Sequence, residues 1–119
     1  MYEIYTHGTF DVDPGNEEAF IEAWSEFASV VSERSGARTL RLLRDVRNPG
    51  RFFSLGEWDD ADAIRAWKSS PEFKERLGRV VSQASKFEPT EQVTLRRVAG
   101  GVVETLSPPE GIEAIHAPG

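Results

Sequence analysis

Cysteine is absent from this 119-residue chain, and histidine occurs only twice. The first absence excludes disulfide bonds, thiolate nucleophiles and thiolate metal ligands. With so few histidines, one chain cannot supply a conventional structural zinc site, so we expect no bound metal. A Gly-rich phosphate loop, a His-Glu-x-x-His pair and a nucleophile elbow are missing as well. The chain therefore carries no strong catalytic signature.

Long apolar runs are also missing, and none approaches the ~20 residues that a membrane span needs. The opening residues, MYEIYTHGTF, lack the basic-then-apolar order of a secretory signal. The net charge is −6 and the isoelectric point is about 4.9, which argues against a nucleic-acid or anionic-membrane partner. These features predict one cytoplasmic domain that binds neither nucleic acid nor membrane.

Arginine is the exception to this acidic balance, because five arginines recur through one segment: Arg38, Arg41, Arg44, Arg47 and Arg51. They could form an anion-binding patch. They could instead sit at strand edges and pair with acidic side chains. The net negative charge favours the second interpretation.

Residues 2–12 alternate between two faces, which predicts a strand. Ile4, Phe10 and Val12 share one face, and His7 lies on the other. Asp13 is expected to cap the next helix, with Pro14 in its first turn.

Residues 15–35 carry one apolar stripe at helical spacing, formed by Phe20, Trp24, Phe27 and Val31. The stripe predicts a helix that lies on a sheet. Gly36 then provides a left-handed helix stop.

Residues 37–46 fit either a helix or a strand, because Leu40, Leu43 and Val46 are spaced three apart. We favour a strand, since a helix stop precedes the segment and the Asn48-Pro49-Gly50 turn follows it. Residues 51–58 then return as an antiparallel strand.

A second helical region follows residue 58, and Ser70-Pro71-Glu72 restarts it as a new helix. Phe87-Glu88-Pro89 is expected to end that helix. Residues 92–98 are predicted as the fourth strand, and residues 102–106 as a short extra strand.

The element order predicts an α+β, ferredoxin-like β-α-β-β-α-β domain with an antiparallel sheet, over residues 1–98. Residues 99–119 form a C-terminal extension, which we expect to be partly flexible or packed on a partner. Helices on one side of the sheet leave Leu43, Phe53 and Leu55 on a bare face. Such an apolar face predicts a homodimer in which two sheets pair into a barrel.

The tryptophans are the most informative candidates for a binding site. Trp58 ends a strand, and Trp67 ends a helix just before the Ser70 restart. Rings at these positions can line a small-molecule pocket, although each could equally be core. His7 could act as a base or a ligand, but packing within the sheet is the simpler interpretation.

Three stretches resemble the antibiotic biosynthesis monooxygenase family. They are Phe10-x-Val12-x-Pro14-Gly15 followed by Glu18-Ala19-Phe20, then Arg51-Phe52-x-Ser54-x-Gly56-x-Trp58, and then Trp67 followed by Ser70-Pro71-Glu72-Phe73. The resemblance covers residues 2–98. It implies a dimeric α+β barrel with a pocket between sheet and helices. Some members of this family oxidise polycyclic phenols, anthrones or quinols with molecular oxygen and no cofactor, and others degrade haem.

The haem-degrading branch of this family uses a histidine shortly after the tryptophan to bind iron. Trp67 matches that tryptophan, but Leu77 stands where the histidine would be. The resemblance therefore disfavours haem degradation. For cofactor-free oxygenation, residue type and position suggest that Trp58, Trp67 and Phe73 bind substrate, while His7 or Arg41 stabilises a substrate anion.

Two functions remain open at this stage. The first is a cofactor-independent monooxygenase for an aromatic, polycyclic or quinol-type molecule. The second is a non-catalytic homodimer that binds a small apolar ligand or only assembles. The sequence shows no obvious acid–base pair, and that favours the second. Nucleic-acid binding by the sheet would need exposed aromatics on a basic surface, which the charge opposes.

Overall fold

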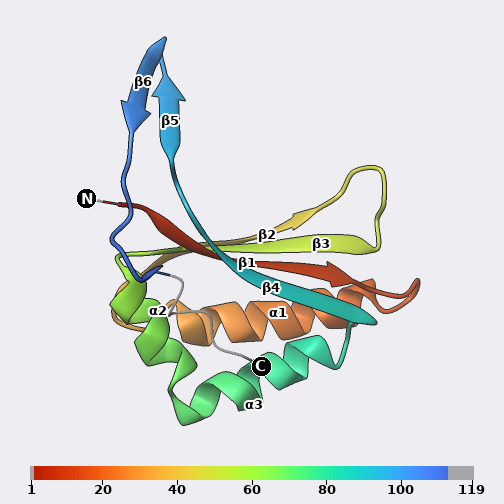
Figure 1. Ribbon diagram of the computed structural model, residues 1–119. Helices are drawn as coiled ribbons and strands as arrows, with labels where there is room; N and C mark the ends of the chain where they lie inside the picture. Colours follow the sequence, from red (N-terminus) through yellow and green to blue (C-terminus); the bar gives the residue numbers. More distant parts are fainter. Residues whose placement is uncertain (1, 113–119) are drawn as a thin grey trace.

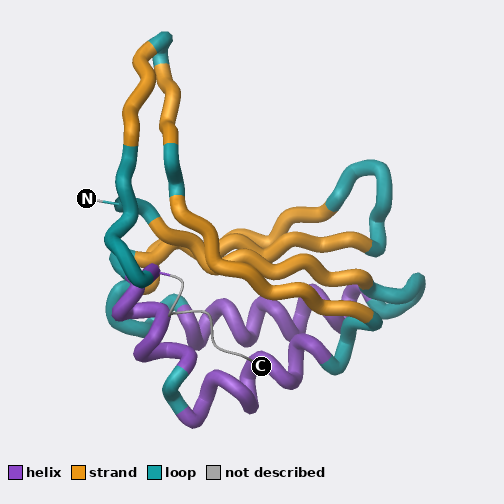
Figure 2. The backbone as a smooth tube through the Cα atoms, viewed as in Figure 1, coloured by secondary structure: helices purple, strands orange, loops and turns teal. Residues whose placement is uncertain are grey.

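The computed structural model describes residues 2–112 of the chain. Its elements follow one another as a split β-α-β pattern with an added hairpin (Figures 1 and 2). In order they are β1 (Ile4–Asp11), α1 (Glu17–Val31), β2 (Ala37–Arg44), β3 (Arg51–Trp58), α2 (Ala61–Lys68), α3 (Pro71–Val81), β4 (Lys86–Val93), β5 (Arg96–Ala99) and β6 (Val102–Thr105).

The main sheet has four antiparallel strands in the order β2-β3-β1-β4. The helices lie on one face of this sheet and leave the other face uncovered (Figure 1). The predicted α+β, ferredoxin-like class is therefore confirmed. The ambiguous segment after Gly36 is strand β2, so the turn signals on either side of it decided its structure correctly.

The start of α1 differs from the sequence prediction. The helix begins at Glu17 with Asn16 as its N-cap residue, and Asp13 accepts a backbone hydrogen bond from Asn16 in the preceding turn. Gly15 has φ +90°, which a right-handed helix cannot contain, so Pro14 and Gly15 stay in the turn. The Asn16 side chain instead donates to the carbonyl of Gln83 (2.6 Å) and ties this turn to the end of α3.

The fourth strand also differs from the prediction, because β4 begins at Lys86 and the preceding helix already ends at Val81. Phe87 and Pro89 therefore lie inside a strand. Proline is tolerated there because β4 is an edge strand, and its outer side needs no N–H donor. Phe87 is held by stacking on Phe10, with ring centroids 4.7 Å apart.

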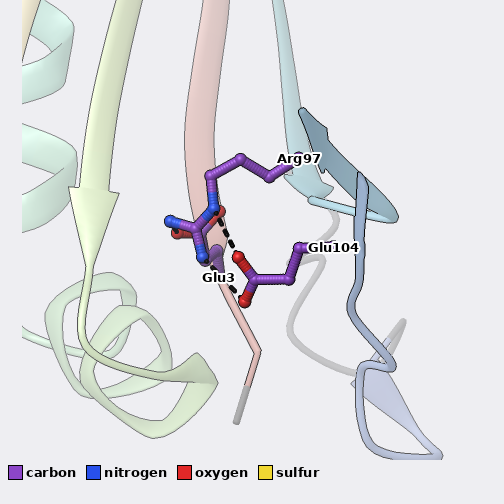
Figure 3. A network of polar contacts seen from close by, with 3 residues as sticks. All are labelled: Glu3, Arg97 and Glu104. Atoms are coloured by element: carbon purple, nitrogen blue, oxygen red, sulfur yellow. Dashed lines mark hydrogen bonds and ion pairs between the residues drawn. The ribbon is translucent and has the colours of Figure 1, made fainter. Parts of the chain in front are cut away.

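Residues 96–105 form a hairpin, β5–β6, which confirms the extra strand but gives it a partner that the sequence prediction lacked. Gly100 and Gly101 both have positive φ, as a tight hairpin turn requires. The hairpin rises away from the helices (Figures 1 and 2). Arg97 fixes its base by pairing with Glu3 (2.6 Å) and Glu104 (3.2 Å), as Figure 3 shows.

The extension beyond the hairpin packs against the core of its own domain. Leu106 is buried, and Ile112 packs against the core beside the end of the sheet. The remaining predicted tail, residues 113–119, lies outside the described residues. Val98, the last residue of the predicted domain, lies within β5.

Two clusters make up the core between sheet and helices. One gathers around Ile4, Trp58 and Ile64, and the other around Phe10, Phe20 and Phe52. Phe20 of α1 is fully buried, with its ring 4.9 Å from each of the Phe10 and Phe52 rings. The stripe predicted on α1 therefore faces the sheet as expected.

Gly15 and Gly36 have similar backbone angles but different surroundings, so substituting each by alanine distinguishes the cost of backbone strain from that of a steric clash. Gly36 has φ +85°, and a Cβ there would lie 2.4 Å from the Cβ of Ala63, whereas Gly15 has φ +90° and open space around it. We expect Gly15→Ala to lower the free energy of unfolding by about 1–2 kcal/mol. Gly36→Ala should cost about 1–3 kcal/mol more, because helix α2 must move. Urea denaturation measures both, and equal losses would contradict the clash.

Candidate functional site

A cavity of about 440 Å³ lies between the sheet and the helices. This volume suits a small organic molecule, and an apolar wall with a few polar groups is typical of such sites. Every strand of the main sheet and all three helices contribute to its wall. Its aromatic and large aliphatic lining residues are Phe10, Trp24, Phe27, Val31, Leu40, Trp58, Trp67, Phe73, Leu77, Val80, Val81 and Phe87.

The cavity exists because side-chain size changes along the two central strands. The inward-facing residues of β1 are Ile4, Thr6, Gly8 and Phe10, and they pair with Trp58, Gly56, Ser54 and Phe52 of β3. Large residues at both ends fill the two core clusters, while small residues in the middle leave space. Two strands in register thus produce one hollow beneath the helices.

The break between α2 and α3 sets the aromatic wall. Ser70 ends α2 by donating its hydroxyl to the carbonyl of Trp67 (2.7 Å), and Pro71 starts α3 in a new direction. Phe73 then meets Trp67 edge-on, with ring centroids 5.6 Å apart and planes at 86°. Phe27 from α1 lies 6.1 Å from Trp67 on another side. These contacts hold the buried Trp67 ring in one orientation.

The other two indoles are fixed by hydroxyl groups of the sheet. Trp58 donates its Nε1–H to Thr6 (3.1 Å), and Trp24 donates its Nε1–H to Ser54 (2.9 Å). Gly56 makes the first bond possible, because a Cβ at this position would lie only 2.7 Å from the Thr6 hydroxyl. Small polar residues therefore both open the cavity and satisfy the indole donors.

A buried ion pair stands at the edge of this apolar space. Lys68, the last residue of α2, lines the cavity and pairs with Glu91 of β4, whose residue faces inward opposite Thr6. Their side chains are only 13% and 5% exposed. Burial lowers the pKa of the Lys68 amine from its ordinary value. The pair escaped sequence reasoning because its members are 23 positions apart and no local spacing connects them.

The predicted site residues divide into two groups. Trp58, Trp67 and Phe73 line the same cavity. Arg41 lies on the opposite face of the sheet, where it pairs with Glu57 at 3.5 Å. His7 borders the cavity from β1, but its ring stacks on Phe53 on the uncovered face, with centroids 6.0 Å apart. This is the direction that strand alternation predicted.

The uncovered face keeps the apolar character expected of it. Leu43 is 45% exposed, and Phe53 and Leu55 are half-buried. The His7 Nδ1 atom on this face is buried and makes no hydrogen bond within residues 2–112. Two arginines of the arginine-rich segment lie at the sheet: Arg44 lies over the Phe52 ring, and Arg51 pairs with Asp11. Arg38, Arg41 and Arg51 have acidic partners, which agrees with the simpler interpretation of that segment.

Residues 2–112 hold neither a cluster of metal-ligating side chains nor a membrane-spanning helix. No group of three or more His, Cys, Asp or Glu side chains is placed to hold a metal ion there. Within the same residues, every helix is too short or too polar to cross a membrane.

The topology and the cavity together define a ferredoxin-like α+β domain with an apolar cavity between its sheet and its helices. The sequence model of the family described as antibiotic biosynthesis monooxygenase matches residues 3–76. The chain belongs to this family, which confirms the resemblance. No curated protein matches the chain by sequence.

Solved structures share the fold at low sequence identity. The N63A mutant of SnoaB, a cofactor-independent oxygenase from Streptomyces nogalater, superposes with a TM-score of 0.73 and 20% identity, covering 82% of this chain and 97% of that one. A conserved protein from Methanosarcina mazei Go1 gives 0.68 and 19%, covering 79% and 92%. These likenesses establish the fold.

The Lys68–Glu91 pair should be strongly coupled in stability. Glu91→Gln removes one partner of a buried ion pair and should lower the free energy of unfolding by about 3–5 kcal/mol. Adding Lys68→Met to that variant should restore part of the loss, because no unpaired buried charge then remains. Urea denaturation of both single variants and the double variant measures the coupling. Additive losses would contradict it.

The matched control is the exposed pair of Lys86 and Glu88, which lies on the same strand as Glu91. Lys86→Met should leave the urea midpoint unchanged, since an exposed pair is screened by water.

Proposed function

We propose that this protein is a cofactor-independent monooxygenase that oxidises an aromatic, polycyclic or quinol-type small molecule inside the cavity. The observation that carries the proposal is the aromatic cavity itself, because Trp58, Trp67 and Phe73 line one space of about 440 Å³ in a member of this monooxygenase family. The shared fold with SnoaB, a cofactor-independent oxygenase, supports the same chemistry.

The chemistry asks little of the protein. An electron-rich phenolate or enolate passes an electron to molecular oxygen, and the two radicals then combine at a ring carbon. One oxygen atom stays on that carbon, and the other leaves as water with two hydrogen atoms of the substrate. In an anthrone both hydrogen atoms come from the oxidised carbon, and in a phenol or quinol one comes from the ring carbon and one from the hydroxyl group. The protein must bind the ring system, favour its anion and keep water from the radical pair.

The cavity wall is suited to these tasks. Trp58 and Trp67 provide flat surfaces on which a ring system can stack, and Phe73 closes the wall beside Trp67. Leu77 lines the cavity where haem degradation would need a histidine, and its side chain cannot bind iron. Arg41 is left without a role in this proposal, because it faces away from the cavity. His7 is assigned to the uncovered face, where its ring lies.

The uncovered face supports a homodimer as part of the same proposal. It carries Leu43, Phe53 and Leu55, and the hairpin that rises beside it exposes Val98 and Val102. A second copy pairing face to face would cover this apolar area and close a barrel between the two sheets.

The dimer can be tested at two exposed apolar positions. Leu43→Asp places a charge on the uncovered face and should raise the dimer dissociation constant about tenfold or more. Val46→Asp is the matched control, because Val46 is 94% exposed in the loop after β2 and should leave assembly intact. Sedimentation velocity over a range of concentrations measures both. A monomeric wild-type protein would rule out the proposed dimer.

Oxygen consumption tests the activity. Purified protein, treated with a chelator, should consume oxygen above the uncatalysed rate with at least one of a panel of anthrones, naphthols and quinols. Leu77→Trp fills part of the cavity and should reduce that rate at least about tenfold. Val46→Trp adds the same ring on the outside and should not.

Trp67→Phe keeps an aromatic ring but shortens the wall, and it should raise KM more than it lowers kcat if Trp67 binds substrate. Absence of oxygen consumption across the panel would overturn the enzyme proposal. Ligand binding that persists in that case would identify a non-catalytic ligand-binding dimer.

A further inference from the structure

A cationic side chain is placed where an apolar ligand could carry a negative charge. Lys68 lines the cavity directly after Trp67, at the end of α2, and its side chain is nearly buried. An ammonium group has three N–H donors. Glu91 accepts from one direction, so donors remain for an oxygen atom in the cavity.

We propose that Lys68 binds the oxyanion of the ligand, so that the cavity selects an apolar ring system with one acidic hydroxyl group and holds it as a phenolate or enolate. This inference rests on the proposed function, since it names the substrate class for the same site. The hydroxyl O–H bond breaks, its proton leaves to solvent, and the new negative charge lies beside the Lys68 ammonium.

Glu91 acts as a positioning residue in this arrangement. It is even more buried than Lys68 and is not part of the cavity wall. Its carboxylate pairs with the Lys68 ammonium and offsets part of the cost of burying it, while burial itself lowers the pKa of the amine. Without the ammonium, burial beside aromatic rings would favour the neutral phenol over its anion.

Two other cations lie near the cavity among the described residues, and neither combines burial with a place in its wall. Lys74 lines it from α3 but is exposed, and Arg34 lies over the Trp67 ring at 5.2 Å from its centroid. The His7 ring lies on the other side of the sheet. Lys68 is therefore the cation that a buried ligand oxygen would meet, and Lys74 provides the direct comparison.

A coloured phenol reports its own ionisation in the cavity. A nitronaphthol absorbs at different wavelengths as phenol and as phenolate, and its nitro group makes it a poor reductant for oxygen. Its apparent pKa should fall by about one unit on binding to the wild-type protein, which corresponds to about tenfold tighter binding of the phenolate than of the phenol. The methyl ether of the same probe has no proton to lose and should bind at one affinity across the pH range.

Four variants at three lysines locate the effect. Lys68→Met should abolish or reverse the pKa shift of the probe while leaving the affinity for the methyl ether within about twofold. Lys68→Arg should keep part of the shift, because it keeps the charge. Lys74→Met and the surface control Lys86→Met should keep the wild-type shift. Near-ultraviolet circular dichroism checks that each variant is folded.

The inference is overturned if the shift persists in Lys68→Met, or if Lys74→Met removes it instead. Should Lys68→Met fail to fold, the wild-type comparison still decides: equal affinity for the naphtholate and the methyl ether at high pH overturns the inference. Oxygen consumption is measured separately. If the pKa shift of the probe depends on Lys68 but no oxygen is consumed, the anion site is supported and the enzyme proposal is contradicted. If oxygen is consumed but the shift does not depend on Lys68, only the anion site is contradicted.

Discussion

The pairing of β1 with β3 is the constraint on which the rest of this structure depends. Its register places Thr6 against Gly56 and Gly8 against Ser54, with large residues at both ends of the two strands. A shift of one residue would send every one of these side chains to the other face of the sheet. The same register therefore fixes the two core clusters, the hollow between them and the hydroxyl groups that hold Trp24 and Trp58.

Helix placement adds the second half of the site. The break between α2 and α3 brings Trp67, Lys68 and Phe73 over the hollow. A short interruption of the helix thus places both an aromatic wall and a positive charge at the cavity. A continuous helix would spread these residues around its circumference at 3.6 residues per turn. Side-chain chemistry and backbone geometry thus converge on one space, although its lining residues come from all seven elements of the main body and from no single motif.

Much of this was predictable from local patterns, and the misses have physical causes. Alternation placed Ile4, Phe10 and His7 on their correct faces, and the Ser70-Pro71 signal located the helix restart. Pro89 misled the prediction because its effect depends on whether its strand lies at the edge, which only the sheet order reveals. The Lys68–Glu91 pair joins α2 to β4, so no reading of neighbouring residues could find it. Arg41 points away from the cavity, as alternation along β2 requires. The sequence alone does not show which face of β2 the helices cover.

All three tryptophans of the chain line the one cavity. The tryptophan emission of the folded protein therefore originates entirely from the walls of this cavity. A compound that enters and absorbs where tryptophan emits should accept energy from these rings and reduce the emission. Tryptophan fluorescence of the unlabelled protein can therefore report ligand entry, and chemical libraries can be screened in this way before any reaction is known.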